Sequence, residues 1–365
     1  MNLGELIRAG RRLFTCCHFS LATPLLYRRP DRIMVNIEKR SVAERDIRQT
    51  ELMVASLTFN RPEGLANLLE AFSGLTAPER SVFLIIDNSP EGNARELITS
   101  AGARGAIDLR YVHEPKPGIS AGRNRALAEA SAVGARWLAF IDDDEWPEPD
   151  WLSHLIAAQL KTGAAAVVGP VEGHLPSGAP AWLERGDFFS FHGPEDGAEI
   201  TEAHAATNNA LIDFFWVQHA GLQFDPSFGL SGGEDTMFFR SLRQHGGSIV
   251  FARSALVHET ITSDRTRLTW LFTRWRRGGN AQARIDMVLA GRSRWQIAAG
   301  GLARFGAGGF MALVLLPAVL VGRFDLVARG LRILCHGVGR FDAACGGVVI
   351  EYKRVASKEA MAVDN

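Results

Sequence analysis

Three consecutive carboxylates, Asp142-Asp143-Asp144, are the part of this sequence best suited to chemistry. They follow the apolar run 137–141, which predicts a short buried strand that ends at polar residues. In an open parallel sheet, ligands bind beyond the carboxyl ends of the strands. Three acids there repel one another unless a cation lies among them, and Mg²⁺ or Mn²⁺ prefers oxygen ligands, including those of substrate phosphates. The triplet therefore predicts a metal–diphosphate site, with a solvated acidic turn as the alternative.

Other polar motifs lie at predicted strand ends or helix starts. One follows the apolar run 52–58, a second follows the run 82–86, and a third opens the helix that precedes the acidic strand. Because a parallel sheet brings the carboxyl ends of its strands to one edge, we expect these motifs to meet the acids there. The motifs are Thr58-Phe59-Asn60-Arg61-Pro62, Asp87-Asn88-Ser89 and Pro117-Gly118-Ile119-Ser120-Ala121-Gly122-Arg123-Asn124.

Alternating strand-like and helix-like segments must position these motifs. Continuous apolar strands at 52–58, 82–86, 109–112 and 137–141 are separated by segments with helical spacing. Such repeated units predict an α/β fold whose mostly parallel sheet is covered by helices on both faces. The pattern then loosens into a long loop at 173–207. After it we expect a strand at 208–214, a helix from Gly232 to about Gln244, and short strands at 248–252 and 255–258.

Charge and cysteine content exclude several classes of protein. Lys plus Arg equals Asp plus Glu, 40 against 40, so no overall charge points to nucleic acid. The four cysteines form no CxxC pair and no Cys/His cluster with zinc spacing. We therefore expect a reducing compartment and no structural metal.

The C-terminal third is basic and carries the longest apolar run. Between Arg253 and Arg340 there are 14 arginines, no lysine and four acids. Residues 305–322 hold no charge and, at 18 residues, are near the lower limit for a spanning helix. A surface or re-entrant mode is our preference, while a single span and a buried soluble helix stay open. The segment 326–338 suits a helix that lies on a surface.

Together, the motifs resemble those of the inverting family-2 glycosyltransferases of the GT-A fold. The resemblance covers about residues 52–258 and implies a mostly parallel sheet flanked by helices, with a Rossmann-like nucleotide-binding half. It further resembles bacterial exopolysaccharide enzymes of the succinoglycan type. By this resemblance, the chain divides into an N-terminal extension (1–50, interfacial or disordered), a GT-A domain (51–266) that folds by itself, and a helical membrane-associating tail (267–365).

The resemblance also implies roles for individual residues. Those expected to bind the donor nucleotide are Thr58, Asn60, Arg61, Asp87, Arg123, Asn124, Asp142 and Asp143. Those expected to hold Mg²⁺ or Mn²⁺ are Asp144 and Asp142, with His258 near the metal or diphosphate. The family's catalytic acids map to Glu234-Asp235, with Asp235 as the expected base and Glu234 as the acceptor-positioning or alternative base. An acidic pair that merely stabilises a helix start is the rival interpretation.

The implied activity is hexosyl transfer, with inversion, from a nucleotide-diphosphate sugar to a hydroxyl group. The expected donor is a uridine diphosphate sugar, and the expected acceptor is a glycan or a glycan on a polyprenyl diphosphate. The expected location is the cytoplasmic face of the bacterial inner membrane, in contact with lipid. Two alternatives stay open: a sugar-nucleotide pyrophosphorylase-like enzyme and a catalytically inactive membrane scaffold. The sequence leaves the sugar, the linkage, the true start (Met1 or Met34) and the oligomeric state undecided.

Overall fold

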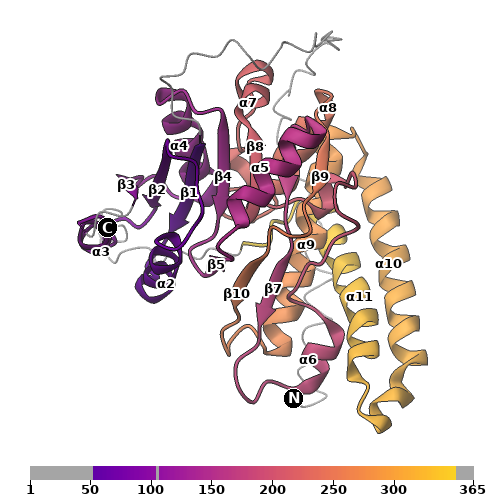
Figure 1. Cartoon of the computed structure of the whole chain (residues 1–365). Helices are drawn as coiled ribbons and strands as arrows, with labels where there is room; N and C mark the ends of the chain where they lie inside the picture. The colour runs from indigo at the N-terminus through magenta and orange to yellow at the C-terminus, as the bar shows by residue number, and fades with distance from the viewer. Residues whose placement is uncertain (1–51, 104–106, 351–365) are drawn as a thin grey trace, which may run out of the picture.

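The computed structural model describes residues 52–103 and 107–350 (Figure 1). The predicted N-terminal extension lies outside these residues. Parallel strands β1 (Leu52–Thr58), β2 (Ser81–Asp87), β3 (Asp108–His113) and β4 (Trp137–Ile141) form one half of the main sheet. The connecting helices are α2 (Pro62–Phe72), α3 (Arg95–Gly102) and α4 (Ile119–Ala132). Strands β1, β2 and β4 are almost wholly buried, as continuous apolar runs predict for a sheet covered on both faces.

The other half of the main sheet departs from purely parallel pairing. The whole main sheet has the strand order β3-β2-β1-β4-β8-β6-β9. Strand β8 (Asn209–Asp213) runs antiparallel to both β4 and β6. Strands β6 (Ala166–Val168) and β9 (Ile249–Phe251) pair in parallel. A smaller sheet has the order β5-β10-β7, built from β5 (Glu145–Pro147), β10 (Val257–Thr260) and β7 (Val171–His174). The expected mostly parallel α/β fold is therefore confirmed, with β8 as the antiparallel strand of the main sheet.

Shorter elements connect these strands. After the acidic turn comes α5 (Trp151–Thr162), and the long loop contains α6 (Ala181–Gly186) and the 3-10 turn η2 (Glu202–His204). Further along lie α7 (Phe214–Ala220), η3 (Pro226–Phe228) and α8 (Glu234–Gln244). The loop predicted at 173–207 thus holds more local structure than its Gly- and Pro-rich composition suggests.

Three long helices form the C-terminal part: α9 (Leu268–Leu289), α10 (Arg294–Val314) and α11 (Phe324–Ala344), with η4 (Leu316–Val321) between the last two. They lie together on the side of the molecule opposite β3, and α11 packs between α9 and α10 (Figure 1). The uncharged segment 305–322 thus comprises the second half of α10, η4 and the turn into α11. Helix α11 is longer than the predicted 326–338 at both ends.

The C-terminal helices share a hydrophobic cluster with the sheet-containing part of the chain that precedes them. Leu271 and Trp275 of α9 and Ala328 of α11 pack with Leu183 of α6 and with Ile261, which follows β10. Cutting the chain at Thr266 would therefore expose this cluster. That residues 51–266 fold without the tail stays a prediction.

Candidate active site

The carboxyl ends of β1, β2 and β4 meet at one edge of the main sheet. Thr58 and Asp87 are direct partners in the parallel register of β1 and β2, and β4 pairs with the other side of β1. Helix α2 begins close to the acidic turn, since a Cβ on Gly64 would lie 2.7 Å from the Asp143 carbonyl oxygen. The fold therefore gathers these three motifs in one place, and the fourth motif joins them through Arg123, which lies 3.8 Å from Asp142.

Arginines from distant segments contact the acidic triplet. Arg61 Nη1 donates to Asp143 Oδ1 at 3.0 Å and to Asp144 Oδ2 at 2.9 Å. Arg265, in the loop after β10, donates to the same Asp144 oxygen at 2.8 Å. Asp143 is buried, and its Oδ2 has no hydrogen-bond partner among the described residues. Two guanidinium groups thus converge on Asp144, while Asp143 keeps an unsatisfied oxygen.

Negative charge exceeds positive charge at this edge. Burial raises the pKa of Asp142 to about 7. Arg123 opposes this rise, while Asp144, Asp235 and Asp143 add to it. The acids gathered here are Asp142, Asp143, Asp144, Glu145, Glu234, Asp235 and Glu259, and the arginines in contact with them are Arg61, Arg123 and Arg265. Crowded carboxylates with a shortage of counter-charge fit a divalent cation with oxygen ligands.

Arg123 connects the acidic triplet to the acidic pair at the start of α8. Its guanidinium is buried, pairs with both Glu234 and Asp235, and has a nitrogen 3.8 Å from Asp142 Oδ1. Burial raises the pKa of Glu234 to about 7, with Asp235 adding to the rise and Arg123 opposing it. The Asp235 side chain is 21% exposed against 5% for Glu234, so Asp235 is the more accessible of the two. Thr207 Oγ1 donates to Asp235 Oδ1 at 3.0 Å and orients it.

Asp87 and Asn60 order the loops on the nucleotide side. Asp87 Oδ1 accepts from the backbone N–H of Ser89 at 2.9 Å, and Oδ2 accepts from that of Ala94 at 2.8 Å. Asn60 has φ 53°, a left-handed conformation that asparagine tolerates, and its Oδ1 accepts from Asn93 at 3.1 Å. Both residues lie at the predicted edge, and their contacts hold its shape.

Asn124 makes its hydrogen bonds to the backbone, an arrangement that favours a structural role over the expected nucleotide contact. Its Nδ2 donates to the Phe224 carbonyl oxygen and its Oδ1 accepts from the Phe224 backbone N–H, both at 2.8 Å. Because Phe224 is fully buried, this amide pair satisfies backbone groups that water cannot reach. Asn124 therefore anchors the segment before η3 to α4.

We expect Asn124→Ala to destabilise the fold without weakening donor binding. The substitution leaves two buried backbone groups of Phe224 unpaired, which costs about 1–3 kcal/mol each. Urea unfolding should show a lower midpoint, while titration calorimetry of the folded protein should give a nucleotide-sugar affinity within about threefold of wild type. If Asn124→Ala instead loses most of its nucleotide-sugar affinity with an unchanged unfolding midpoint, Asn124 contacts the donor as first expected.

The contacts of His258 also favour a role other than the expected one near the metal or diphosphate. Successive strand residues point to opposite faces, and on β10 Glu259 points to Arg265 and the acids. His258 points the other way, with its ring stacked on Trp146 at 5.4 Å and its Nδ1 2.9 Å from His174 Nε2. Among the described residues, His258 makes polar contacts with Glu148, Glu172 and His174 and none with Asp142 or Asp144.

Sequence reasoning missed several residues of the site. Arg265, Thr207, Glu145 and Glu259 lie in loops or short strands without a local motif. Asn208 donates to Glu145 Oε1 at 2.8 Å, while Glu145 Oε2 accepts from the Asp142 backbone at 3.0 Å. Glu145 thereby fixes the turn that presents the triplet. In the sequence, the position of Glu145 directly after the acidic triplet is the one feature that points to this role.

An α/β sheet with crowded acids at its strand ends, joined through a buried arginine to a second acidic pair, defines a glycosyltransferase of the GT-A class. Comparisons with known proteins give the family. The model described as "Glycosyl transferase family 2" matches residues 54–219. Succinoglycan biosynthesis protein ExoM of Rhizobium meliloti is 38% identical over 248 residues, 67% of this chain and 78% of that protein. The chain belongs to glycosyltransferase family 2, whose enzymes invert the anomeric centre.

Two more distant similarities were also found. Glycosyltransferase AglE of Haloferax volcanii is 27% identical over 201 residues, 54% of this chain and 63% of that protein. Among solved structures, S. aureus TarS 1–349 in complex with UDP gives a TM-score of 0.45 at 14% identity, covering 83% of this chain and 93% of that one. GT-A enzymes of this kind typically use a divalent metal.

Proposed function

We propose that this enzyme transfers a sugar from a uridine diphosphate donor to a hydroxyl of a glycan carried on a polyprenyl diphosphate. The product would be part of a bacterial cell-surface polysaccharide, as the name of the R. meliloti relative suggests. The observation that carries the chemistry is the buried guanidinium of Arg123, which contacts Glu234, Asp235 and Asp142 at once. Arg123 therefore connects the edge of the sheet where the donor is expected to bind with Asp235, the expected base.

The donor would lie across the ends of β1, β2 and β4. Thr58, Asn60, Arg61 and Asp87 surround the space proposed for the nucleotide, and Asp142 with Asp143 would face its sugar and diphosphate part. Asp144 and Asp142 would hold Mg²⁺ or Mn²⁺, which when bound neutralises the leaving diphosphate. Arg61 and Arg265 both contact Asp144 and are placed to add positive charge beside it.

The acceptor hydroxyl must lose its proton as it attacks. Asp235 is proposed as the base, because it is the more exposed member of the pair and Thr207 orients it. Glu234 is nearly buried, and its Oε2 has no partner among the described residues. We assign Glu234 the task of holding Arg123 in place, with the exchange of these two roles as the alternative.

Attachment to the inner face of the cytoplasmic membrane is proposed for the C-terminal helices. In the part of the chain that the structure describes, α10 is long and apolar enough to cross a membrane. Large apolar side chains on α10 and η4 face outward, among them Phe310 at 70% exposed and Leu320 at 90%. Helices α10 and α11 join at η4, which makes an apolar hairpin tip (Figure 1).

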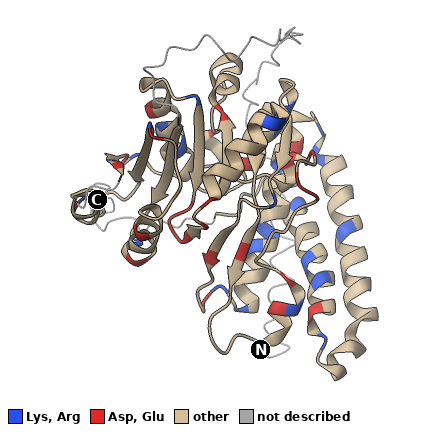
Figure 2. Ribbon diagram, in the orientation of Figure 1, with Lys and Arg blue, Asp and Glu red and all other residues tan. Residues whose placement is uncertain are grey.

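The packing of α10 against α11 also suits a membrane. A Cβ on Gly308 would lie 2.3 Å from the Leu334 nitrogen, and one on Gly301 would lie 2.9 Å from the Gly337 carbonyl oxygen. Glycines at such contacts let helix backbones approach closely, as in lipid, where packing replaces the hydrophobic effect. Basic segments on α9, α11 and α10 (Figure 2) would meet anionic headgroups.

The double variant Phe310→Glu/Leu320→Glu should move the enzyme from membranes to the soluble fraction. Burying each side chain is worth about 1.5–3 kcal/mol, so losing both weakens partitioning by about 10²–10⁴-fold. Leu160→Glu is the matched control, because Leu160 is 55% exposed on α5, outside the proposed hairpin. Fractionation with detergent release measures the effect. If the wild-type protein is found wholly in the soluble fraction at physiological salt, the membrane assignment is wrong.

A panel of nucleotide sugars, incubated with purified enzyme and lipid-linked acceptors, tests the proposed activity. Release of a nucleoside diphosphate with a glycosylated lipid product is the expected result. Release of inorganic diphosphate would indicate the pyrophosphorylase-like alternative. An inactive scaffold would bind neither metal nor donor.

A further inference from the structure

Two histidines and two glutamates gather on one face of the small sheet, the face of β10 opposite Glu259. Ligand atoms of Glu172, His174 and His258 all lie within 4.8 Å of one another. His174 Nε2 is 2.9 Å from His258 Nδ1, and Glu172 Oε2 is 3.8 Å from the same Nδ1. The parallel register of β7 and β10 produces this arrangement, because it places His258 beside Glu172 and His174 beside Thr260.

Neighbouring groups fix the orientation of His258. Its Nε2 is 2.8 Å from Glu148 Oε1. An ionised carboxylate only accepts hydrogen bonds, so Nε2 carries the proton and Nδ1 keeps its lone pair directed at His174 and Glu172. The Trp146 ring stacks on both imidazoles, at 5.3 Å from His174 and 5.4 Å from His258. A histidine whose far nitrogen donates to a carboxylate is the usual supporting arrangement of a metal-binding imidazole.

The distances are near those that a bound ion needs. Around a tetrahedral Zn²⁺ with bonds of about 2.05 Å, neighbouring ligand atoms lie about 3.3 Å apart. The two nitrogens, 2.9 Å apart, would separate by a few tenths of an ångström, and the Glu172 oxygen, 3.8 Å from His258 Nδ1 and within 4.8 Å of the His174 ligand atom, would have to move closer to both. The His258 side chain is 13% exposed, whereas Glu172 and His174 are exposed, so the ion would lie at the surface.

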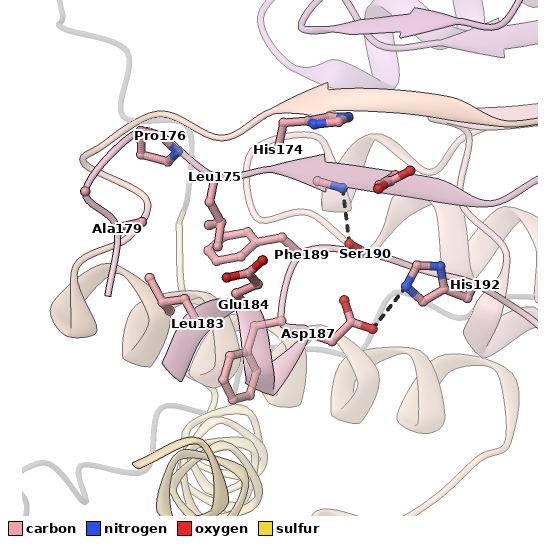
Figure 3. Close-up of a pocket in the computed structure, with 14 residues that line it drawn as sticks. His174, Leu175, Pro176, Ala179, Leu183, Glu184, Asp187, Phe189, Ser190 and His192 are labelled. Atoms are coloured by element: carbon pink, nitrogen blue, oxygen red, sulfur yellow. Dashed lines mark hydrogen bonds and ion pairs between the residues drawn. The ribbon is translucent and has the colours of Figure 1, made fainter. Parts of the chain in front are cut away.

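We propose that Glu172, His174 and His258 form a transition-metal site of the zinc type, separate from the Mg²⁺ or Mn²⁺ site expected at Asp144. Two imidazoles and one carboxylate favour Zn²⁺ over Mg²⁺, whereas the acidic triplet offers only oxygen ligands. Three protein ligands leave a fourth position open, as in catalytic zinc sites. Glu172 and His174 also line a cavity of about 500 Å³ (Figure 3). A water oxygen is the ligand that the open position would take.

Cobalt(II) substitution tests the site independently of sugar transfer. Full-length enzyme in detergent, with saturating Mg²⁺ to fill the acidic site, should bind one equivalent of Co²⁺ with the visible absorption of a tetrahedral nitrogen–oxygen site. Glu172→Gln and His174→Ala should abolish this absorption. Glu148→Gln should weaken Co²⁺ binding by about 10–100-fold, the usual effect of losing a supporting partner.

Asp144→Ala is the matched control and should keep the absorption. Thermal melting without metal checks that each variant folds, and Zn²⁺ should raise the melting temperature of wild type but not of His174→Ala. Absorption that survives both Glu172→Gln and His174→Ala would overturn the proposal. So would absorption that is lost in Asp144→Ala, because the ion would then sit at the acidic triplet. Both outcomes leave the proposed transferase activity untouched.

Discussion

Asp235→Asn is expected to lower turnover by about 10²–10⁴-fold, the usual effect of removing a general base. The amide keeps the size of the carboxylate and can still accept the hydrogen bond from Thr207, but it cannot take the acceptor proton. Arg123 retains Glu234 as a partner, so the acids and arginines stay in place. Donor affinity by titration calorimetry should therefore stay within about threefold, while the rate of nucleoside diphosphate release falls.

Two further variants separate the roles of the acidic pair. Thr207→Val conserves the side-chain shape and removes only the hydrogen bond to Asp235, so its turnover should fall by less than about tenfold. Glu234→Gln should act mainly through Arg123 and affect stability and turnover together. Retained turnover in Asp235→Asn, combined with its loss in Glu234→Gln, would exchange the two assignments. If neither changes turnover, the family's roles do not apply at this pair.

The strands and their polar ends were predictable because their signals are local. Continuous apolar runs that end in Thr58, Asp87 and Asp142 predicted the sheet and its active edge without knowledge of any long-range contact. Family resemblance supplied the acidic pair, which the fold connects to this edge through Arg123. The comparisons confirm the family and the sheet topology confirms the fold, while the roles of individual residues stay predictions.

What could not be predicted depends on pairing between distant segments. Asn124 sits in a motif that suggests nucleotide binding, yet both of its hydrogen bonds go to Phe224, 100 positions away. His174 and His258 are 84 positions apart and meet only because β7 and β10 pair in parallel. Zinc motifs are recognised by short spacing, so two histidines separated in this way leave no trace in the sequence. Arg265 reaches Asp144 across 121 positions.

Asp144→Ala is expected to abolish metal-dependent turnover. Asp144 is the last acid of the triplet and the one proposed to bind the metal most directly, so its loss removes the charge neutralisation that makes the diphosphate a good leaving group. In saturating Mg²⁺, the variant should bind the nucleotide sugar more weakly than wild type. Product formation with Mg²⁺, with Mn²⁺ and with excess chelator measures the first effect, and calorimetry measures the second.

Donor binding without metal gives a sharper distinction. Removing the Asp144 carboxylate frees the N–H groups of Arg61 and Arg265 that donate to it at 2.9 and 2.8 Å, while Arg61 keeps Asp143 and Arg265 keeps Glu259 as a partner. Freed guanidinium groups are good partners for phosphate, so in chelator the variant should bind the donor as tightly as wild type or more tightly. Metal should then add nothing to its affinity, whereas it strengthens binding by wild type. Asp144→Asn is the control, since its amide oxygen can still accept from both arginines. Full wild-type activity in excess chelator would show that catalysis does not need a metal at Asp144, and Arg61 and Arg265 would then have to neutralise the departing diphosphate.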